Sequence, residues 1–317
     1  GAYVQSFWLT IDDELAKPII QRVLLLRESL QQLIQVYEVN QELDELTPLA
    51  VPKREELWHR RLSRFPPVTE VESGKVTKKL IALAPDAIDV VRARHGETLR
   101  YFGLPFARVR EVMGSEKVWF GLEGSRRRML EPGNESELSN LLGDLMEHRA
   151  ANATDHQHAL YRNAAEAWLE SLLRRDITRL DPGLIIAPLH AQFRFARGGV
   201  FGVRPVDLLA LRRDGRLAVI ELKVSEAREH VLQGVDYWQR VEAHRRRGNI
   251  TRAALFGERK IKNEPPLVYL VAPTLRVHPA FNVLARCIAP DIEIYRFDIN
   301  ENWRSDVRVM RRIRVNR

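Results

Sequence analysis

Apolar residues recur along the first part of the chain at three- and four-residue steps, which is the period of an amphipathic helix. Over residues 11–46 this spacing predicts one long helix or two in succession, with Pro18 at a first turn or a kink. Shorter apolar runs over 75–83 and 117–122 predict strands or buried helix ends, and a further helix is expected over 136–149. Residues 1–150 are therefore expected to form a helix-rich α+β domain.

The hydrophobic pattern changes after residue 158, where runs of alternating or continuously apolar residues begin. Asp214-Gly215 lies between two such runs and predicts a hairpin turn, because both residue types accept the positive φ angles of a tight turn. The expected elements are helices over 159–174, 226–247 and 280–288, and strands over 184–197, 206–211, 217–224, 266–272 and 292–297. This order predicts an α/β fold for residues 151–317, with a mixed sheet flanked by helices.

The composition fits a folded protein with a basic surface. Of 317 residues 45% are apolar, and 50 Lys and Arg against 42 Asp and Glu give a formal charge of +8. A positive balance favours a polyanionic partner such as nucleic acid, although many basic proteins have none. The single cysteine, Cys287, excludes a disulfide framework and a cysteine-based zinc site, so a cytoplasmic protein is expected. We expect neither a membrane span nor a secretory signal.

Three charged residues interrupt the apolar strands of the predicted hairpin. Asp207 begins one strand, while Glu221 and Lys223 stand two residues apart on the other and so share a face. Charged groups in a core strand are paired, hold a metal or catalyse, because burying them alone is costly. Two neighbouring carboxylates suit Mg²⁺ or Mn²⁺, an ion that can activate water and stabilise charge on a phosphodiester. Lys223 would then orient the water or neutralise charge at phosphorus.

This arrangement resembles the PD-(D/E)xK nuclease superfamily, whose restriction-endonuclease-like fold occurs in many restriction enzymes, Holliday-junction resolvases and RecB-type nucleases. The matching residues are Pro205-Val206-Asp207 and Glu221-Leu222-Lys223, with the Pro-Asp pair relaxed to Pro-x-Asp. The resemblance covers roughly residues 159–297. It implies that Asp207 and Glu221 are metal ligands and that Lys223 is the catalytic lysine.

The helices on either side of the hairpin carry further candidates. Gln233 and Tyr237 resemble the Gln-x-x-x-Tyr element that RecB-type members place beside the metal site, which implies a catalytic role for Gln233 and a nucleic-acid contact for Tyr237. Family members often supply one more metal-site acid from the preceding helix, which here carries Glu166 and Glu170. Glu166 lies just beyond the apolar face and Glu170 well outside it, so Glu166 is the preferred ligand. Glu166 and Gln233 could equally be surface groups, and Tyr237 could be a core residue.

Basic residues near the hairpin are candidate contacts for phosphate groups. Arg194, Arg197 and Arg204 surround the Gly-Gly turn that leads to Asp207, and they are the preferred nucleic-acid-binding residues. The basic runs over 126–128 and 245–247 are further candidates. The second run is also explained by the favourable interaction of cations with a helix C-terminus.

The sequence therefore predicts a Mg²⁺- or Mn²⁺-dependent nuclease in residues 151–317. We expect it to cleave nucleic acid as an endonuclease, with DNA favoured over RNA. The alternative is a non-catalytic nucleic-acid-binding or assembly module on the same fold. Residues 1–150 would serve interaction or substrate recognition, and their amphipathic face could support a homodimer. No Gly-rich phosphate loop is present, which argues against a nucleotide-driven motor.

Overall fold

The computed structural model describes residues 5–40, 45–58, 72–93, 96–122, 127–193 and 206–317. The chain forms two compact units. Unit 1 contains Gly1–Val68, Asp181–Ile299 and Val309–Arg317, and unit 2 contains Thr69–Leu180 and Asn300–Arg308. These borders differ from the expected boundary at residue 150, because the first part of the chain packs with the C-terminal sheet.

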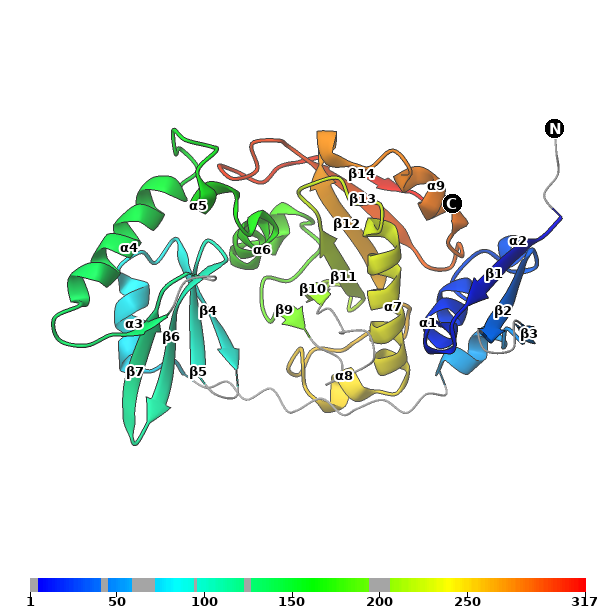
Figure 1. Ribbon diagram of the computed structural model, residues 1–317, viewed down its shortest axis with the longest axis horizontal. Helices are drawn as coiled ribbons and strands as arrows, with labels where there is room; N and C mark the ends of the chain where they lie inside the picture. The colour runs from blue at the N-terminus through cyan, green and yellow to red at the C-terminus, as the bar shows by residue number, and fades with distance from the viewer. Residues whose placement is uncertain (1–4, 41–44, 59–71, 94–95, 123–126, 194–205) are drawn as a thin grey trace. The chain divides into compact units, whose positions relative to one another are not determined.

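Unit 1 is built on a six-stranded mixed sheet with the order β14-β13-β12-β11-β10-β9 (Figure 1). Its strands are β9 (His190–Phe193), β10 (Val206–Leu211), β11 (Leu217–Leu222), β12 (Leu267–Pro273), β13 (Ile294–Ile299) and β14 (Val309–Arg314). Strands β11, β12 and β13 run parallel, whereas β10 is antiparallel to both of its neighbours, β9 and β11, and β14 is antiparallel to β13. The expected α/β class with a mixed C-terminal sheet is confirmed.

The central strands of this sheet are apolar on both faces except at Glu221 of β11. Every residue of β11 and β12 is buried, as expected for parallel strands that are covered on both sides. The expected hairpin between β10 and β11 is present. Gly215 at its tip has a φ of 84°, and the Gly215 N–H donates to the carbonyl of Arg212 at 2.9 Å.

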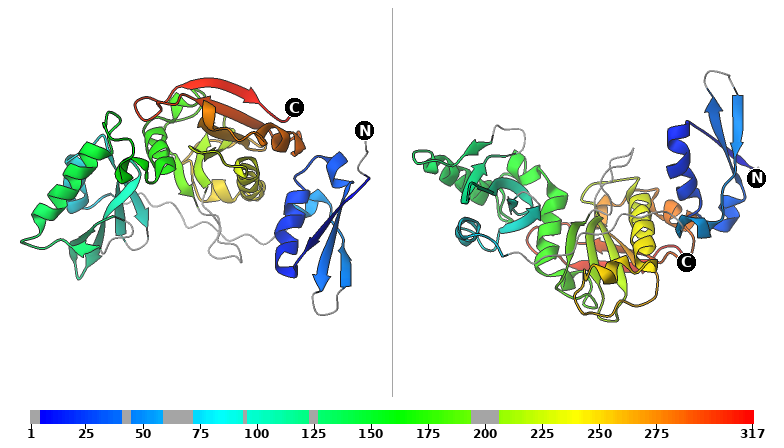
Figure 2. Two further views of the ribbon diagram at one scale, coloured as in Figure 1. Left: turned by 45° about the horizontal axis from the view of Figure 1, so that its top comes forward. Right: turned by 90° about the horizontal axis from the view of Figure 1, so that it is seen from below.

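Helix α7 (His230–Arg246) packs closely on β11 and β12, and α8 (Asn249–Arg252) and α9 (Phe281–Cys287) complete the C-terminal part of unit 1 (Figures 1 and 2). The close approach depends on Gly234, since a Cβ there would lie 2.5 Å from Cδ2 of Leu270. Expected helices over 226–247 and 280–288 are confirmed with shorter bounds.

The N-terminal part of unit 1 differs from expectation. It consists of β1 (Phe7–Ile11), α1 (Asp13–Val23), α2 (Glu28–Gln31), β2 (Ile34–Asn40), β3 (Glu45–Leu49) and the 3₁₀ helix η1 (Arg54–Trp58). The strands form a small sheet in the order β1-β2-β3. The predicted long helix over 11–46 is therefore wrong, because α1 ends at Val23 and the β-branched residues Ile34, Val36 and Val39 favour the strand β2.

This N-terminal part belongs to the hydrophobic core beneath the C-terminal helices. Leu24, Leu25 and Leu57 are buried in one cluster with Val235 and Trp238 of α7. The carbonyl of Leu25 also accepts a hydrogen bond from the N–H of Ala289 at 3.0 Å. Residues distant in sequence thus share one core within unit 1.

Unit 2 contains a five-stranded antiparallel sheet in the order β4-β5-β6-β7-β8. Its strands are β4 (Ile88–Ala93), β5 (Gly96–Tyr101), β6 (Leu104–Val112), β7 (Ser115–Phe120) and β8 (Arg128–Met129), and its helices are α3 (Lys75–Ala82), α4 (Glu135–His148), α5 (Ala159–Arg162), α6 (Ala165–Arg175) and the 3₁₀ helix η2 (Ile177–Arg179). Leu80 of α3 and Leu142 of α4 pack against Leu99 and Phe106 of the sheet. This region holds more strand than the helix-rich pattern predicted.

A buried arginine stabilises the backbone where α5 ends and α6 begins, although the sequence predicted one continuous helix there. Ala164 at the break has a φ of 49°. The Arg149 guanidinium, which is fully buried, donates to the carbonyls of Leu160 at 2.6 Å and Asn163 at 2.7 Å, and lies 4.7 Å from the centre of the Trp168 ring. Burial lowers the pKa of Arg149 to about 9.

Across the described part of the chain, no helix has both the length and the apolar character to cross a membrane.

Candidate active site

Asp207 and Glu221 stand opposite each other on two paired strands. Strands β10 and β11 pair Leu208 with Ile220, so the next pair in this register is Asp207 with Glu221. Directly opposed residues share a face, with Cβ atoms roughly 5 Å apart. Because β11 lies between β10 and β12, it is an interior strand. Glu221 is thus not explained as a solvated residue on an edge strand.

The three charged residues of the hairpin contact one another or the backbone between them. The Leu222 N–H donates to Oδ2 of the half-buried Asp207 at 2.9 Å. The Lys223 ammonium donates to Oε1 of Glu221 at 2.8 Å and to the carbonyl of Leu222 at 3.2 Å. Glu221 is 2% exposed and Lys223 is 9% exposed. The structure therefore brings together all three residues that the sequence motif identified.

Glu221 is electrostatically strained in this arrangement. Burial raises its pKa well above the ordinary value, and repulsion from Asp207 raises it further, while Lys223 acts in the opposite direction. Its second oxygen, Oε2, is buried and has no hydrogen-bond donor among the residues that the structure describes. When both carboxylates are ionised, the single ammonium leaves an excess negative charge, which a cation would neutralise.

His230, at the start of α7, also contacts this site and was not identified from the sequence. Its Nε2 lies 3.3 Å from the carbonyl oxygen of Glu221, and the side chain is 3% exposed. Burial lowers the pKa of His230 from 6.5 to about 3, so the ring is neutral at physiological pH. The tautomer protonated at Nε2 donates to that carbonyl and holds the end of β11. The only sequence signal was its place in the first turn of the helix after the hairpin.

Helix α7 covers the face of the sheet that carries Glu221. Tyr237 of α7 packs against Leu217 and Val219, which alternate with Glu221 along β11 and so point to the same side. Tyr237 is only 4% exposed and belongs to this core, and its nucleic-acid contact stays a prediction. Gln233 is half-buried, and its Oε1 has no hydrogen-bond partner within the described ranges. Its catalytic role stays a prediction.

Of the two acidic residues of α6, Glu170 is more deeply buried than the sequence predicted. Glu170 was expected to lie outside the apolar face, yet it is 2% exposed and pairs with Arg100 at 3.2 Å in unit 2. Glu166 is half-buried in the same unit, and its role as a third metal ligand stays a prediction. No group of three or more His, Cys, Asp or Glu side chains is arranged for metal binding within the residues described.

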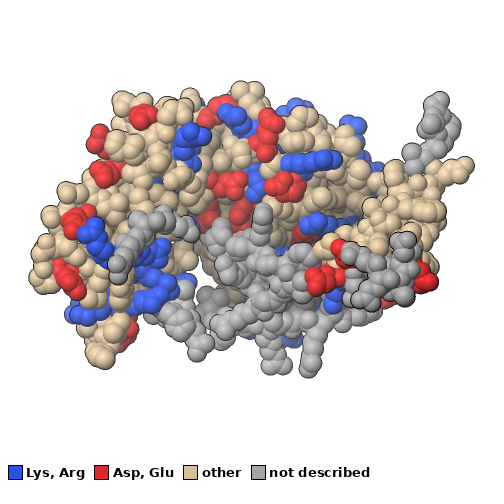
Figure 3. Space-filling view, viewed as in Figure 1, with Lys and Arg blue, Asp and Glu red and all other residues tan. Residues whose placement is uncertain are grey.

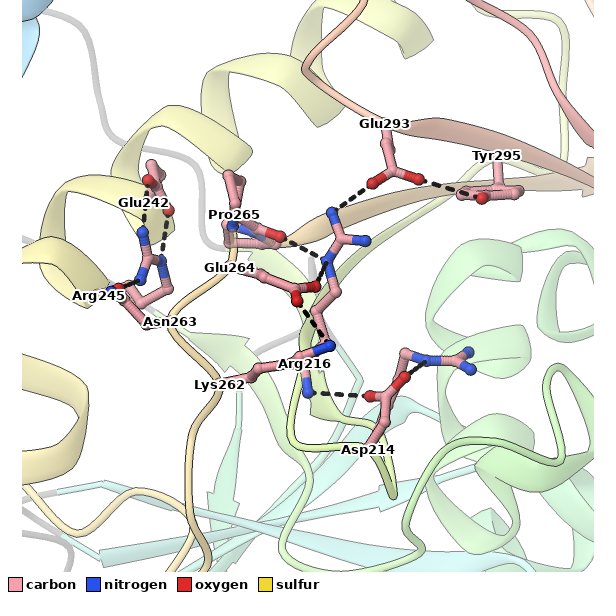
Figure 4. A network of polar contacts seen from close by, with 12 residues as sticks. Asp214, Arg216, Glu242, Arg245, Lys262, Asn263, Glu264, Pro265, Glu293 and Tyr295 are labelled. Atoms are coloured by element: carbon pink, nitrogen blue, oxygen red, sulfur yellow. Dashed lines mark hydrogen bonds and ion pairs between the residues drawn. The ribbon is translucent and has the colours of Figure 1, made fainter.

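The structure describes only some of the basic residues that were predicted to contact phosphate groups. Arg194, Arg197 and Arg204 lie outside the described residues. In the run 245–247, the Arg245 guanidinium pairs with the fully buried Glu242 at 2.6 Å and donates to Oδ1 of Asn263 at 2.6 Å (Figure 4). This part of the run is neutralised within the protein and anchors the loop after α8.

The comparisons with known proteins add little to this geometry. No protein-family model matches the chain, and no curated protein sequence matches it. Among solved structures, an EndoMS–dsDNA complex matches with 15% identity and a TM-score of 0.22, over 62% of this chain and 59% of that chain. A TM-score this low does not establish a shared fold, so nothing below depends on the match.

Proposed function

We propose that this chain is a metal-dependent nuclease that hydrolyses phosphodiester bonds, with DNA as its preferred substrate. The observation that carries the proposal is the facing pair of Asp207 and Glu221 on interior strands, with the Lys223 ammonium bound to Glu221 at 2.8 Å. An acidic pair and a lysine at this position have no packing role that apolar residues would not fill better. The mixed sheet and its flanking α7 support the resemblance to PD-(D/E)xK nucleases.

The residues present fit a divalent cation such as Mg²⁺ or Mn²⁺. Asp207 and Glu221 would hold the ion, since hard oxygen ligands are what these cations prefer. The donor-free Oε2 of Glu221 and the raised pKa of that carboxyl both indicate a place where positive charge is needed. When bound, the ion would lower the pKa of a water molecule and offset charge on the phosphodiester.

The protein's own residues would supply the remaining requirements. Lys223 is 9% exposed, so water screens its positive charge only weakly. The ammonium would therefore stabilise the negative charge that develops on the phosphate during hydrolysis. The Leu222 N–H orients the Asp207 carboxylate, and the neutral His230 holds the Glu221 backbone. The formal charge of +8 supports a polyanionic substrate.

The test is cleavage of supercoiled plasmid, linear duplex, single-stranded DNA and RNA with Mg²⁺, Mn²⁺ or EDTA. We expect metal-dependent nicking or linearisation of the plasmid by the wild type, which would mark an endonuclease, and at least a 100-fold loss in Asp207→Ala and Lys223→Ala. Failure of the folded wild type to cut any substrate with either metal would contradict the proposal. It would favour the non-catalytic nucleic-acid-binding module instead.

A further inference from the structure

One face of the five-stranded sheet in unit 2 carries cations and an aromatic ring. Strands β6 and β7 pair Arg108 with Trp119 and Arg110 with Lys117, so these four side chains share a face. The alternate residue Val109 points to the other face and belongs to the core with α3 and α4. We call the four residues, together with Arg127 just before β8, the basic sheet face.

The cations of this face have no acidic partner among the residues that the structure describes. Arg110, Lys117 and Arg127 are exposed and Arg108 is half-buried, and none of the four forms an ion pair within the described ranges. Several other cations of unit 2 are ion-paired, as Arg128 is with Glu137 at 2.6 Å and Arg100 with Asp89 at 2.8 Å. Figure 3 shows Lys and Arg side chains gathered over this part of the sheet. Four cations without an ion pair in the described structure thus lie close together on this sheet.

A bound anion would relieve the repulsion within this cluster of cations. Burial lowers the pKa of Arg108, and the neighbouring charges of Arg110 and Arg127 lower it further. The Nε of Arg108 is also buried without a hydrogen-bond partner in the described structure. Phosphate oxygens would accept that hydrogen and relieve the repulsion among the guanidinium groups.

The ring of Trp119 favours single-stranded over double-stranded nucleic acid as the ligand of this face. The Arg110 guanidinium lies 5.8 Å from the centre of the half-buried Trp119 ring, and Met129 pairs with Trp119 from β8. A flat surface that alternates cations with an aromatic ring matches a single strand, which presents phosphates and unstacked bases together. A duplex keeps its bases stacked inside and would leave the ring unused.

We propose that the basic sheet face binds single-stranded nucleic acid, with the phosphates on the four cations and a base against Trp119. This site goes beyond the proposed nuclease centre, because its residues lie in unit 2 whereas Asp207 and Glu221 lie in unit 1. Binding at this face requires no metal and no cleavage. It can therefore be tested even if the proposed nuclease activity fails.

The first test measures binding by the full chain in EDTA, using fluorescence anisotropy with a labelled 20-nucleotide single strand over a range of salt concentrations. The variant Arg110→Ala with Lys117→Ala is expected to bind about tenfold more weakly at 0.1 M salt, with a salt slope reduced by about 1.4, since each phosphate contact on a single strand contributes about 0.7. The matched control is Lys78→Ala with Arg92→Ala, which removes one Lys and one Arg that are ion-paired in the same unit. The control is expected to bind within about twofold of the wild type.

The second test examines the aromatic contact. Trp119→Ala is expected to weaken single-strand binding about tenfold and duplex binding by less than twofold, whereas Trp119→Phe retains most single-strand binding. Thermal unfolding of each variant identifies any that fails to fold, and the conservative Phe variant then decides. Equal losses in the double variant and its control, or tighter binding of duplex than of single strand, would overturn the proposal.

Discussion

At the scale of single residues, the opposed carboxylates of Asp207 and Glu221 make the metal-free site less stable than a neutral one. Asp207→Asn removes that repulsion, retains an acceptor for the Leu222 N–H and leaves the Glu221–Lys223 pair intact. We expect it to raise the free energy of unfolding in EDTA at pH 8 by about 1 kcal/mol. Saturating Mn²⁺, at about 100 times its dissociation constant, should stabilise the wild type by roughly 3 kcal/mol and the variant by much less.

Urea unfolding with and without Mn²⁺ measures both effects. Asp214→Asn is the matched control, because Asp214 is an exposed carboxylate at the tip of the same hairpin. This control should retain the full Mn²⁺ effect. Equal stabilisation of Asp207→Asn and wild type by Mn²⁺ would show that the metal binds elsewhere.

His230 gives a residue-scale prediction about pH. Its pKa in the folded state is about 3, compared with 6.5 ordinarily, so between these values the unfolded chain binds a proton that the folded chain does not. Stability is therefore lost as the pH falls below about 6.5, by at most about 1.4 kcal/mol per pH unit from this group. In His230→Gln that part of the pH dependence should disappear.

Unfolding curves collected between pH 8 and pH 4 provide this measurement. His156→Gln is the control, since His156 is an exposed histidine whose removal should leave the curve of stability against pH close to that of the wild type. A wild type and a His230→Gln variant that lose stability in parallel would refute the assignment of a buried neutral ring.

At the scale of elements, a buried ionic network joins separate strands of the main sheet. The Tyr269 hydroxyl of β12 donates to Asp181 at 2.7 Å, Arg212 beyond β10 pairs with the same carboxylate, and Arg312 of β14 lies 3.5 Å from it. Burial alone would raise the pKa of Asp181, but hydrogen bonds from Tyr269 and the Gly183 N–H, together with the arginine charges, lower it. The carboxylate thus remains charged in the fold.

Asp181→Ala should lower the free energy of unfolding by about 3–5 kcal/mol, because it leaves Arg212 partly buried without its main counter-charge. Tyr269→Phe should lower it by less, about 2 kcal/mol, because the hydroxyl loses its hydrogen bonds with Asp181, Arg212 and Arg312 while the charges of the network remain. Chemical denaturation of the two variants tests this order. A larger loss for Tyr269→Phe than for Asp181→Ala would show that the Asp181 carboxylate is not the centre of this ionic network.

The sequence predicted some elements well because the signals were local. The hairpin was predicted from alternation and from Asp214-Gly215, and the same hairpin carries Asp207, Glu221 and Lys223, so a short motif located the candidate site. Strand β2 was mistaken for a helix because its apolar residues also fit helical steps, and only pairing with β1 and β3 settles the choice. Strand β14 was not predicted because its arginines mask the apolar alternation.

At the scale of the whole molecule, unit 1 combines both ends of the chain, which no local pattern could predict. Leu25 is 1% exposed and shares a core with Trp238 and Phe281 from the C-terminal half. Such contacts between distant residues depend on the assembled fold, and they explain why a boundary at residue 150 differs from the division into compact units. The interaction or recognition role expected for residues 1–150, and a homodimer, stay predictions.

Leu25→Ala tests this shared core. It should lower the free energy of unfolding by about 2–5 kcal/mol, which is the usual range for a fully buried leucine. Leu46→Ala is the control, because Leu46 is 49% exposed in the same N-terminal part and should change stability by less than about 0.5 kcal/mol. Similar small effects of both substitutions, measured by denaturation, would show that residues 1–68 do not share the core of unit 1.

The most direct test of the account is the single-turnover rate of DNA cleavage in Mg²⁺ for wild type, Glu221→Gln and Asp214→Asn. Both variants lose one carboxylate from the same hairpin, but only Glu221 faces Asp207 and binds Lys223. The account predicts a loss of at least 100-fold for Glu221→Gln and a rate within about twofold of the wild type for Asp214→Asn. Cleavage by Glu221→Gln at the wild-type rate would contradict a nuclease centre at this pair.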